Sequence, residues 1–174
     1  MGGKDTINGV KCRHCGSDVS HVLVDLGAAP PSNAYLTKMA LKRPEKYFPL
    51  RVLVCESCWL VQAEAYSRAA ELFNEEYAYF SSFSSEWLAH AKKYVDEMVK
   101  RFDLSESSIV GEVAANDGYL LQFVKERGIS CYGIEPTAST ANAARQKGIE
   151  ILQDFLNTSL AQQLRNQGKT ADLV

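Results

Sequence analysis

The sequence of 174 residues predicts an α/β protein, in which a small zinc-binding module precedes a Rossmann-like parallel sheet. Three observations predict this fold. Four of the five cysteines form two Cys-x-x-Cys pairs, both in the N-terminal third of the chain. From Ile109 onward, short apolar runs alternate with helical stretches. Gly128, Gly148 and Gly168 each follow such a stretch, where a glycine commonly ends a helix.

The two cysteine pairs, Cys12 with Cys15 and Cys55 with Cys58, predict one structural zinc ion. A gap of two residues lets both sulfurs of a tight turn reach the same ion. Gly16 suits the positive φ that such a turn often needs. Four thiolates fill a tetrahedral zinc site, so no position stays open for catalysis. A redox pair would normally open a helix, and neither pair is followed by a helix start.

Composition and charge exclude several classes of function. The formal net charge is -2 and the pI about 5.9, so the chain has no basic stripe to meet nucleic acid. It has no apolar run near the ~20 residues of a membrane span, and no apolar signal core. We therefore expect a cytoplasmic protein without a disulfide framework. The fifth cysteine, Cys131, is expected to be a buried free thiol with no metal or catalytic role.

We expect the chain to divide into three parts. Residues 1–66 form the zinc-binding module, residues 67–104 a connecting helical segment, and residues 105–174 a partial Rossmann-like domain. The connecting segment contains a helix over residues 85–102, because its apolar residues recur at three- and four-residue steps. Ser85 is the expected N-cap of that helix.

The remaining elements follow from the same patterns. In the zinc-binding module we expect strands at 22–26 and 47–54, with a return strand at 60–62. In the partial domain we expect strands at 109–113, 130–134, 149–153 and 171–174, and helices at 119–127, 139–147 and 158–166. Strand–helix repeats of this length predict a parallel sheet with right-handed crossovers, and the chain stops inside the fourth strand.

The first strand–helix turn of the partial domain predicts a cofactor site. Glu112 ends the strand, and a loop of small residues precedes the helix. The loop residues that we expect to contact the cofactor are Ala114, Asn116, Asp117 and Gly118.

Small residues let a ligand approach the backbone, and Asn116 can adopt the left-handed conformation where glycine is more common. Glu135 ends the second strand, where an acid accepts hydrogen bonds from both ribose hydroxyls. Asp154, after the third strand, is a further candidate for the adenine end.

Two cofactor classes compete for such a loop. The dinucleotide fingerprint Gly-x-Gly-x-x-Gly is missing, which disfavours a nicotinamide dehydrogenase. The pattern Glu-x-Gly-x-Gly-x-Gly of S-adenosylmethionine-dependent methyltransferases fits better, with Ala114 and Asn116 in place of its first two glycines. Glu112 then suits an acid near the methionine amino group that orders the loop. An ordinary tight turn without a ligand is the alternative interpretation.

Several stretches of the chain occur together in one known family. They are the two Cys-x-x-Cys turns, the segment Leu26-Gly27-Ala28-Ala29-Pro30-Pro31-Ser32-Asn33-Ala34-Tyr35-Leu36 between them, Tyr77-Ala78-Tyr79-Phe80-Ser81-Ser82, Glu112-Val113-Ala114-Ala115-Asn116-Asp117-Gly118-Tyr119-Leu120-Leu121, and Gly133-Ile134-Glu135-Pro136. With these motifs the chain resembles, over nearly its whole length, the zinc-containing C-methyltransferases that act on nucleotide-activated deoxysugars.

The resemblance implies a sheet of the class I methyltransferase type, structural zinc, S-adenosylmethionine as cofactor and a nucleotide sugar as substrate. In that family a base removes the proton at C3 of a 4-keto sugar, and the enolate carbon takes the methyl group from the sulfonium. The residues usually credited with proton transfer lie beyond residue 174, so the catalytic residues of this chain are unknown. Tyr77 and Tyr79 are candidates for one wall of the sugar site, or else for aromatic packing between domains.

These implications lead to two further expectations and one rival. We expect this chain alone to be inactive, and its last strand to form an unprotected sheet edge through which copies self-associate. The rival from another class is a zinc-stabilised protein-interaction or scaffold module without catalysis. Binding of S-adenosylmethionine distinguishes the two.

Overall fold

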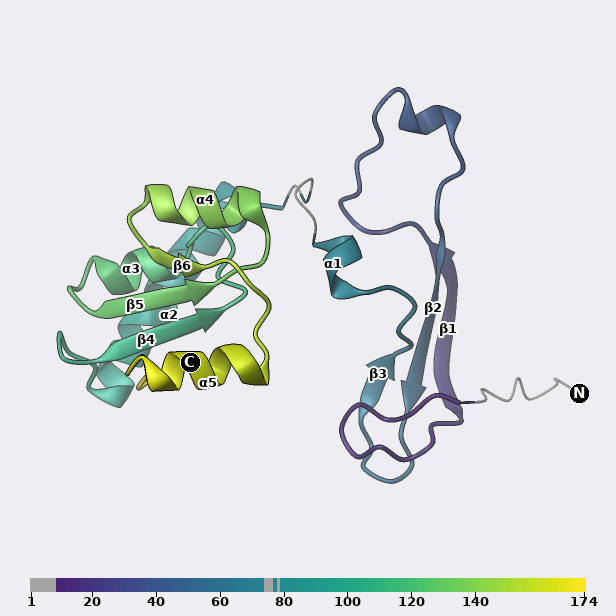
Figure 1. Ribbon diagram of the computed structural model, residues 1–174, viewed down its shortest axis with the longest axis horizontal. Coiled ribbons are helices and arrows are strands. Elements are labelled where there is room, and N and C mark those ends of the chain that lie inside the picture. Colours follow the sequence, from purple (N-terminus) through teal and green to yellow (C-terminus); the bar gives the residue numbers. More distant parts are fainter. Residues whose placement is uncertain (1–8, 74–76, 78) are drawn as a thin grey trace, which may run out of the picture. The chain divides into compact units, whose positions relative to one another are not determined.

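The computed structural model describes residues 9–73, 77 and 79–174 (Figure 1). Within it the chain forms two compact units, Met1–Leu72 and Phe73–Val174. We call them the zinc unit and the sheet unit, and each is described by itself. The division into three parts at residues 66 and 104 stays a prediction.

The zinc unit is built on a three-stranded antiparallel sheet in the order β1-β2-β3. Its strands are β1 (His21–Ala29), β2 (Phe48–Val54) and β3 (Val61–Ala63), close to the three that the sequence predicts. A short 3-10 helix, η1 (Ala40–Lys42), lies in the long connection from β1 to β2, and α1 (Ala69–Leu72) follows β3. The register of β1 against β2 shifts twice, so this hairpin is irregular.

The core of the zinc unit is small. Its buried residues are Cys12, Val19, Leu53 and Cys55, while β1 is exposed over most of its length. Four buried side chains remove little apolar surface from water, and a domain of this size usually needs a further source of stability. A metal ion bound by the cysteines would supply it.

In the sheet unit, a short 3-10 helix, η2 (Ser81–Phe83), is followed by the long helix α2 (Ser85–Phe102), whose bounds match the prediction. The predicted N-cap was wrong by one residue. Ser84 has extended backbone angles and its Oγ accepts the Trp87 N–H at 3.1 Å, so Ser84 caps the helix. Ala91 and Val95 bury the inner face of α2. No helix among the described residues is long and apolar enough to cross a membrane.

The sheet of this unit is parallel, in the order β4-β5-β6. Its strands are β4 (Ile109–Val113), β5 (Ser130–Ile134) and β6 (Glu150–Leu152), and the connecting helices are α3 (Leu121–Lys125) and α4 (Ala138–Gln146). After β6 comes α5 (Thr158–Asn166). The predicted fold class, an α/β protein with a zinc module and a Rossmann-like parallel sheet, is confirmed.

The predicted fourth strand, residues 171–174, forms only a single bridge. Leu173 pairs with Val110 in parallel, the Gly111 N–H donates to the Leu173 carbonyl at 2.9 Å, and the Asp172 N–H donates to the Ile109 carbonyl at 2.8 Å. The last residues therefore lie along β4, whose ladder with β5 is separate from these contacts. In such a sheet β4 stands at the point where the strand order reverses, and ligands bind beyond the carboxyl ends of the strands there.

The sheet is covered on both faces. One cluster joins residues of α2, α3 and α4 to one face, including Val95, Leu121 and Ala144. The other joins Leu160 and Leu164 of α5 to Tyr132 and Ile134 of β5. Figure 1 shows α4 and α5 on opposite sides of the strands. This three-layer packing holds the carboxyl ends of β4 and β5, where the predicted cofactor residues lie, on a rigid frame.

Candidate metal centre and cofactor site

The structure brings together all four cysteines that the sequence pairs. The Sγ atoms of Cys12 and Cys58 are 3.6 Å apart, as are those of Cys15 and Cys55, and all four lie within 4.8 Å of one another. Four sulfurs placed about 2.3 Å from a central ion in a tetrahedron are about 3.8 Å apart. The cluster therefore has the dimensions of a four-thiolate zinc site. His14 and His21 are not part of it.

Each pair of cysteines sits on the same kind of turn. In the first, the Gly16 N–H donates to the Cys12 carbonyl at 3.0 Å, and Gly16 has φ +74°. In the second, the Trp59 N–H donates to the Cys55 carbonyl at 2.8 Å, and Trp59 has φ +62°. The positive φ predicted for Gly16 is confirmed. No signal in the sequence indicates that Trp59 takes the matching position, because tryptophan rarely adopts this conformation.

The pKa values of the thiols indicate that the four cysteines need a cation before all of them can be deprotonated. The backbone N–H of Cys15 is the largest cause that lowers the pKa of Cys12, to about 6. The Leu60 N–H lowers the pKa of Cys58, but burial and the three neighbouring thiols raise it to about 12. Adjacent thiols cannot all lose their protons unless a cation offsets their charge. The donor set therefore fits a divalent ion, and four sulfurs in a tetrahedron favour zinc.

The cofactor loop, residues 112–118, keeps the backbone of a glycine-rich loop with a single glycine. Its three alternate residues Ala114, Asn116 and Gly118 have φ +59°, +50° and +74°. These are the three positions where the pattern Glu-x-Gly-x-Gly-x-Gly has glycine. The left-handed conformation predicted for Asn116 is confirmed, and Ala114 shares it. The loop therefore has the backbone path of a cofactor loop although its side chains differ.

Glu135 holds this loop from the end of β5. Its carboxylate is buried, with the residue 5% exposed, and each oxygen accepts one backbone N–H. Oε2 accepts the Asn116 N–H at 2.9 Å, and Oε1 accepts the Thr137 N–H at 2.9 Å. The contact that orders the loop, which we expected from Glu112, is thus made by Glu135. A carboxylate has about four lone-pair positions, so the Glu135 oxygens keep acceptor capacity for ribose hydroxyls.

Glu112 lies near the end of β4, next to the aromatic ring of Tyr119. Its Oε2 is buried and has no hydrogen-bond partner among the described residues. Burial raises the pKa of the Glu112 carboxyl to about 8, and the nearby hydroxyl of Tyr119 only partly opposes this. Burial also raises the pKa of Tyr119 to about 12, with a contribution from Glu112. A buried carboxyl with one unpartnered oxygen would gain a partner from a ligand with a cationic amine.

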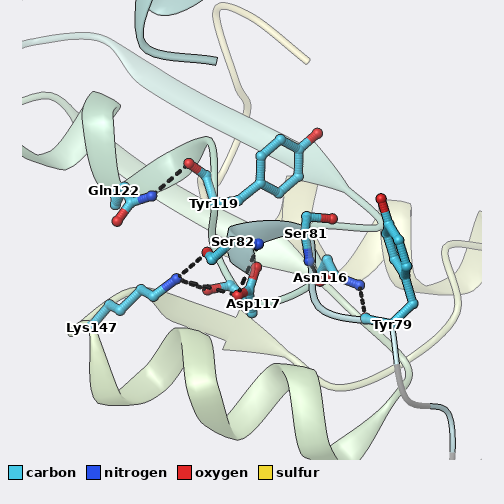
Figure 2. A network of polar contacts seen from close by, with 8 residues as sticks. All are labelled: Tyr79, Ser81, Ser82, Asn116, Asp117, Tyr119, Gln122 and Lys147. Atoms are coloured by element: carbon cyan, nitrogen blue, oxygen red, sulfur yellow. Dashed lines mark hydrogen bonds and ion pairs between the residues drawn. The ribbon is translucent and has the colours of Figure 1, made fainter. Parts of the chain in front are cut away.

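Asn116 and Asp117 direct their side chains to the segment before α2, residues 79–82 (Figure 2). The Asn116 side chain accepts the Ser81 N–H at 2.9 Å and donates to the Tyr79 carbonyl at 3.0 Å. The Asp117 carboxylate accepts the Ser82 N–H at 3.3 Å. Their predicted cofactor contacts would therefore be made by backbone atoms, and remain a prediction.

The other candidates lie in different surroundings. Tyr79 is half exposed, and its ring lies near that of Tyr119, whose pKa it helps to raise (Figure 2). Tyr77 packs edge-on against Phe73, with ring centroids 5.2 Å apart. Asp154 is exposed and accepts the N–H of its neighbour Phe155 at 2.7 Å. None of these three roles is tested by the structure.

One residue of the site escaped the sequence analysis. Lys147, just after α4, donates to the Ser82 Oγ at 2.7 Å and to the Asp117 carbonyl at 2.7 Å. Its Nζ also lies 3.5 Å from the Asp117 carboxylate. These contacts join residues far apart in the sequence, and no local pattern around a lysine near a helix end announces them. Cys131 is partly buried beside the core, and burial raises its pKa.

Comparisons with known proteins bear on both units. A family described as "Putative zinc binding domain" matches residues 12–73, and one described as "Methionine biosynthesis protein MetW" matches residues 91–171. A relative, "C-methyltransferase NovU" from Streptomyces niveus, is 28% identical over 164 residues, which are 94% of this chain and 39% of that protein. Over both of its units the chain is therefore similar to zinc-containing, S-adenosylmethionine-dependent C-methyltransferases.

These similarities agree with the motifs that carried the resemblance. The zinc-binding family match, the four-cysteine cluster and the methyltransferase relative support zinc and S-adenosylmethionine as cofactors, as predicted. The four clustered sulfurs lie in the zinc unit, where residues 12–73 match the zinc-binding family. The chain spans 39% of the length of the curated relative.

Two solved structures show limited similarity to this chain. An RNA methyltransferase from Salinibacter ruber in complex with S-adenosyl-L-homocysteine is 22% identical, with a TM-score of 0.33 over 44% of this chain and 65% of that chain. A SAM dependent methyltransferase from Archaeoglobus fulgidus is 15% identical, with a TM-score of 0.29 over 41% of this chain and 35% of that chain.

Proposed function

We propose that the sheet unit binds S-adenosylmethionine at the carboxyl ends of β4 and β5, for C-methylation of a nucleotide-linked keto-deoxysugar by a whole protein of this family. The observation that carries the proposal is the loop of residues 112–118. It has positive φ at all three glycine positions of the methyltransferase pattern, and it is held by a buried acid at the end of the next strand. An acid at that place accepts hydrogen bonds from ribose hydroxyls.

The proposed roles follow from where each group lies. Glu135 receives the ribose hydroxyls while it holds the Asn116 N–H. Glu112, buried and without a partner for Oε2 in the described part of the chain, receives the cationic amino group of the methionine part. Backbone atoms of Ala114 and Gly118 line the ligand. Asp154 is proposed for the adenine end, although its exposure makes this contact the least enclosed.

The chemistry proposed for the whole protein conserves atoms and charge. A base takes the proton from the carbon next to the sugar ketone, and the resulting enolate carbon forms a bond to the methyl carbon. The bond from that methyl to sulfur breaks, which leaves the neutral thioether S-adenosylhomocysteine. The cofactor supplies an electrophilic methyl group, and the four-cysteine zinc site, which is closed, takes no part. Tyr77 and Tyr79 are proposed for the wall of the sugar site.

Calorimetry with S-adenosylhomocysteine tests the proposal on this chain. We expect one site per chain, with no comparable heat from a nicotinamide dinucleotide. Heat from neither ligand would favour the rival function, a zinc-stabilised interaction module. Turnover is a separate measurement: the chain spans 39% of the relative's length, and we propose that methyl transfer to a nucleotide sugar needs more than these residues. Methyl transfer by the 174-residue chain would contradict that part.

A further inference from the structure

The side chain of Asn116 binds the 79–82 segment in the manner of a neighbouring strand. It accepts one backbone N–H, from Ser81, and donates to one backbone carbonyl, that of Tyr79. Both ends of its amide are therefore used, and the bond to Ser81 is buried. An amide held by two backbone groups cannot turn without breaking both bonds, so the position of Tyr79 depends on the conformation of the cofactor loop.

Lys147 fixes the same two segments from the other side (Figure 2). Its three donors match three acceptors: the Ser82 hydroxyl and the Asp117 carbonyl at 2.7 Å each, and the Asp117 carboxylate at 3.5 Å. Asp117 is 3% exposed, so its charge is poorly solvated and depends on Lys147. A buried carboxylate that loses its partner is costly, and this pair therefore resists separation of the loop from the segment.

The same loop residue also touches the proposed ligand acid. The Asn116 N–H donates to the Glu135 carboxylate, which the proposed function assigns to the ribose hydroxyls. A ligand that hydrogen-bonds to Glu135 is therefore connected to Asn116 through one further hydrogen bond, and to the Ser81 N–H through two. The chain of contacts is continuous and buried, which is the condition for two sites to influence each other.

We propose that Asn116 and Lys147 are positioning residues that lock the 79–82 segment to the cofactor loop, so that an occupied cofactor site fixes the place of Tyr79. The inference rests on the proposed function, because it takes S-adenosylmethionine or its product as the ligand. Coupling of this kind is reciprocal: if the ligand tightens the segment, loss of the lock weakens the ligand by the same factor.

The test follows amide hydrogen exchange at Ser81 and Ser82 in the whole 174-residue chain, with S-adenosylhomocysteine as the probe. In the unmodified chain both amides are expected to exchange slowly, and about 5-fold more slowly when the ligand saturates. Asn116→Gly removes the amide and keeps a residue suited to φ +50°. In this variant the Ser81 amide, which loses its acceptor, should exchange quickly with or without ligand, and the ligand should bind about 5-fold more weakly.

Lys147→Met should act in the same direction, and Lys147→Arg, which keeps the charge and donors, should restore the response to ligand. Lys169→Met is the matched control, because Lys169 pairs with Glu150 and its side chain is 32% exposed against 30% for Lys147. The control should leave the Ser81 and Ser82 amides unchanged.

The outcomes separate this inference from the proposed function. Ligand heat in the unmodified chain together with unchanged exchange at Ser81 and Ser82 would overturn the coupling alone. Slow exchange of the Ser81 amide in Asn116→Gly would overturn the lock itself, whether or not ligand binds. Absence of ligand heat in the unmodified chain would overturn the proposed function and the coupling, while the exchange of the ligand-free variants would still decide on the lock.

Discussion

The core of the zinc unit contains four buried residues, and two of them, Cys12 and Cys55, belong to the metal cluster. The larger core cluster of the sheet unit contains ten, all apolar and drawn from three helices, the sheet and the loops beside its strands. The first core is too small to offset the entropy of an ordered chain, whereas the second has the makeup of an ordinary domain. The comparison indicates that one unit folds around an ion and the other around apolar packing.

The two units also differ in how they use buried polar groups. Apart from the buried Gln62, the zinc unit gathers its polar chemistry in one cluster of sulfurs that a single ion can satisfy. The sheet unit buries Asn116, Asp117 and Glu135 at the carboxyl edge of its sheet, where they accept backbone N–H groups, while Asp117 Oδ1 has no hydrogen-bond partner among the described residues. Polar groups in the first unit therefore serve stability, and those in the second form a site that is costly to maintain.

The largest expected effect is the loss of zinc. Structural zinc in small modules contributes on the order of 10 kcal/mol to folding, so Cys58→Ser or chelation should unfold the zinc unit and leave the sheet unit folded. The matched control is Cys131→Ala, which should keep one zinc per chain because Cys131 lies outside the cluster.

Each unit carries one of the two tryptophans, Trp59 and Trp87, so fluorescence can follow the units separately. Trp87→Phe leaves a reporter in the zinc unit, and Trp59→Phe leaves one in the sheet unit. After chelation only the reporter of the zinc unit should show an unfolded environment. A zinc content near zero in the unmodified chain, or unfolding of both units together, would contradict the conclusion that only the zinc unit folds around an ion.

The second prediction concerns the pH-dependent loss of stability that comes from burying the Glu112 carboxyl in the sheet unit. Burial raises the pKa of Glu112 in the folded state to about 8 from its ordinary value of 4.5, so the folded state holds this proton more tightly than the unfolded state. Its contribution to stability is full below pH 4.5 and is lost as the pH rises towards 8, by on the order of a few kcal/mol. Glu112→Gln, which does not titrate, should flatten this part of the stability curve.

Urea unfolding of the sheet unit, followed through Trp87 at several pH values, measures the difference between the two proteins. Other groups that titrate in this range cancel in that difference. A constant difference from pH 4.5 to 8 would mean that the Glu112 carboxyl is not buried as the structure has it.

Much of this sheet unit follows from local sequence signals. The strands at 109–113 and 130–134 and the helices at 85–102 and 158–166 were predicted to the residue, because apolar runs, helical periodicity and terminal glycines agree there. Ser84 and Ser85 are both good caps, so the sequence could not choose between them. Helix α3 is shorter than predicted, because Gly118 lies in the loop at φ +74° and residues up to Leu120 form turns.

The third prediction tests the ligand role of the buried acid that holds the loop. A charge-assisted hydrogen bond contributes about 1.5–3 kcal/mol, so Glu135→Ala should weaken binding of S-adenosylhomocysteine at least ~10-fold in calorimetry. The variant also frees the Asn116 and Thr137 N–H groups, and should lower the stability of the sheet unit. Glu150→Ala, which removes an exposed acid of the same sheet, is the control. An unchanged affinity would remove Glu135 from the site.

The site was harder to predict than the fold because its contacts are long-range. The sequence indicated Glu135 and the conformation of Asn116, since both follow from position in a strand–helix turn. It gave no indication that the Asn116 side chain binds residues 35 and 37 positions earlier, or that Lys147 joins Ser82 across 65 positions. Such partners are determined by how helices and strands pack against one another, and this packing produces no periodic pattern in the sequence.

The smallest expected effect compares one strained residue from each unit. Trp59 in the second cysteine turn and Ala114 in the cofactor loop have φ +62° and +59°, where glycine is the ordinary choice. The left-handed conformation costs a residue with a Cβ about 1–2 kcal/mol, while glycine adds about 0.4–1 kcal/mol of entropy to the unfolded chain. Because both side chains are exposed, little packing is lost, and the difference leaves a net gain.

We therefore expect Trp59→Gly and Ala114→Gly to stabilise their own units by about 0.5–1 kcal/mol. Competition with a chelator measures the first as tighter zinc retention, and urea unfolding followed through Trp87 measures the second. Ala115→Gly is the matched control for the loop, because Ala115 is fully buried and, unlike Ala114, does not have a positive φ. It loses packing and gains unfolded-state entropy without relief of strain, so it should destabilise the sheet unit. If Ala114→Gly and Ala115→Gly changed stability in the same direction, the loop would not carry the strained backbone on which the proposed cofactor site depends.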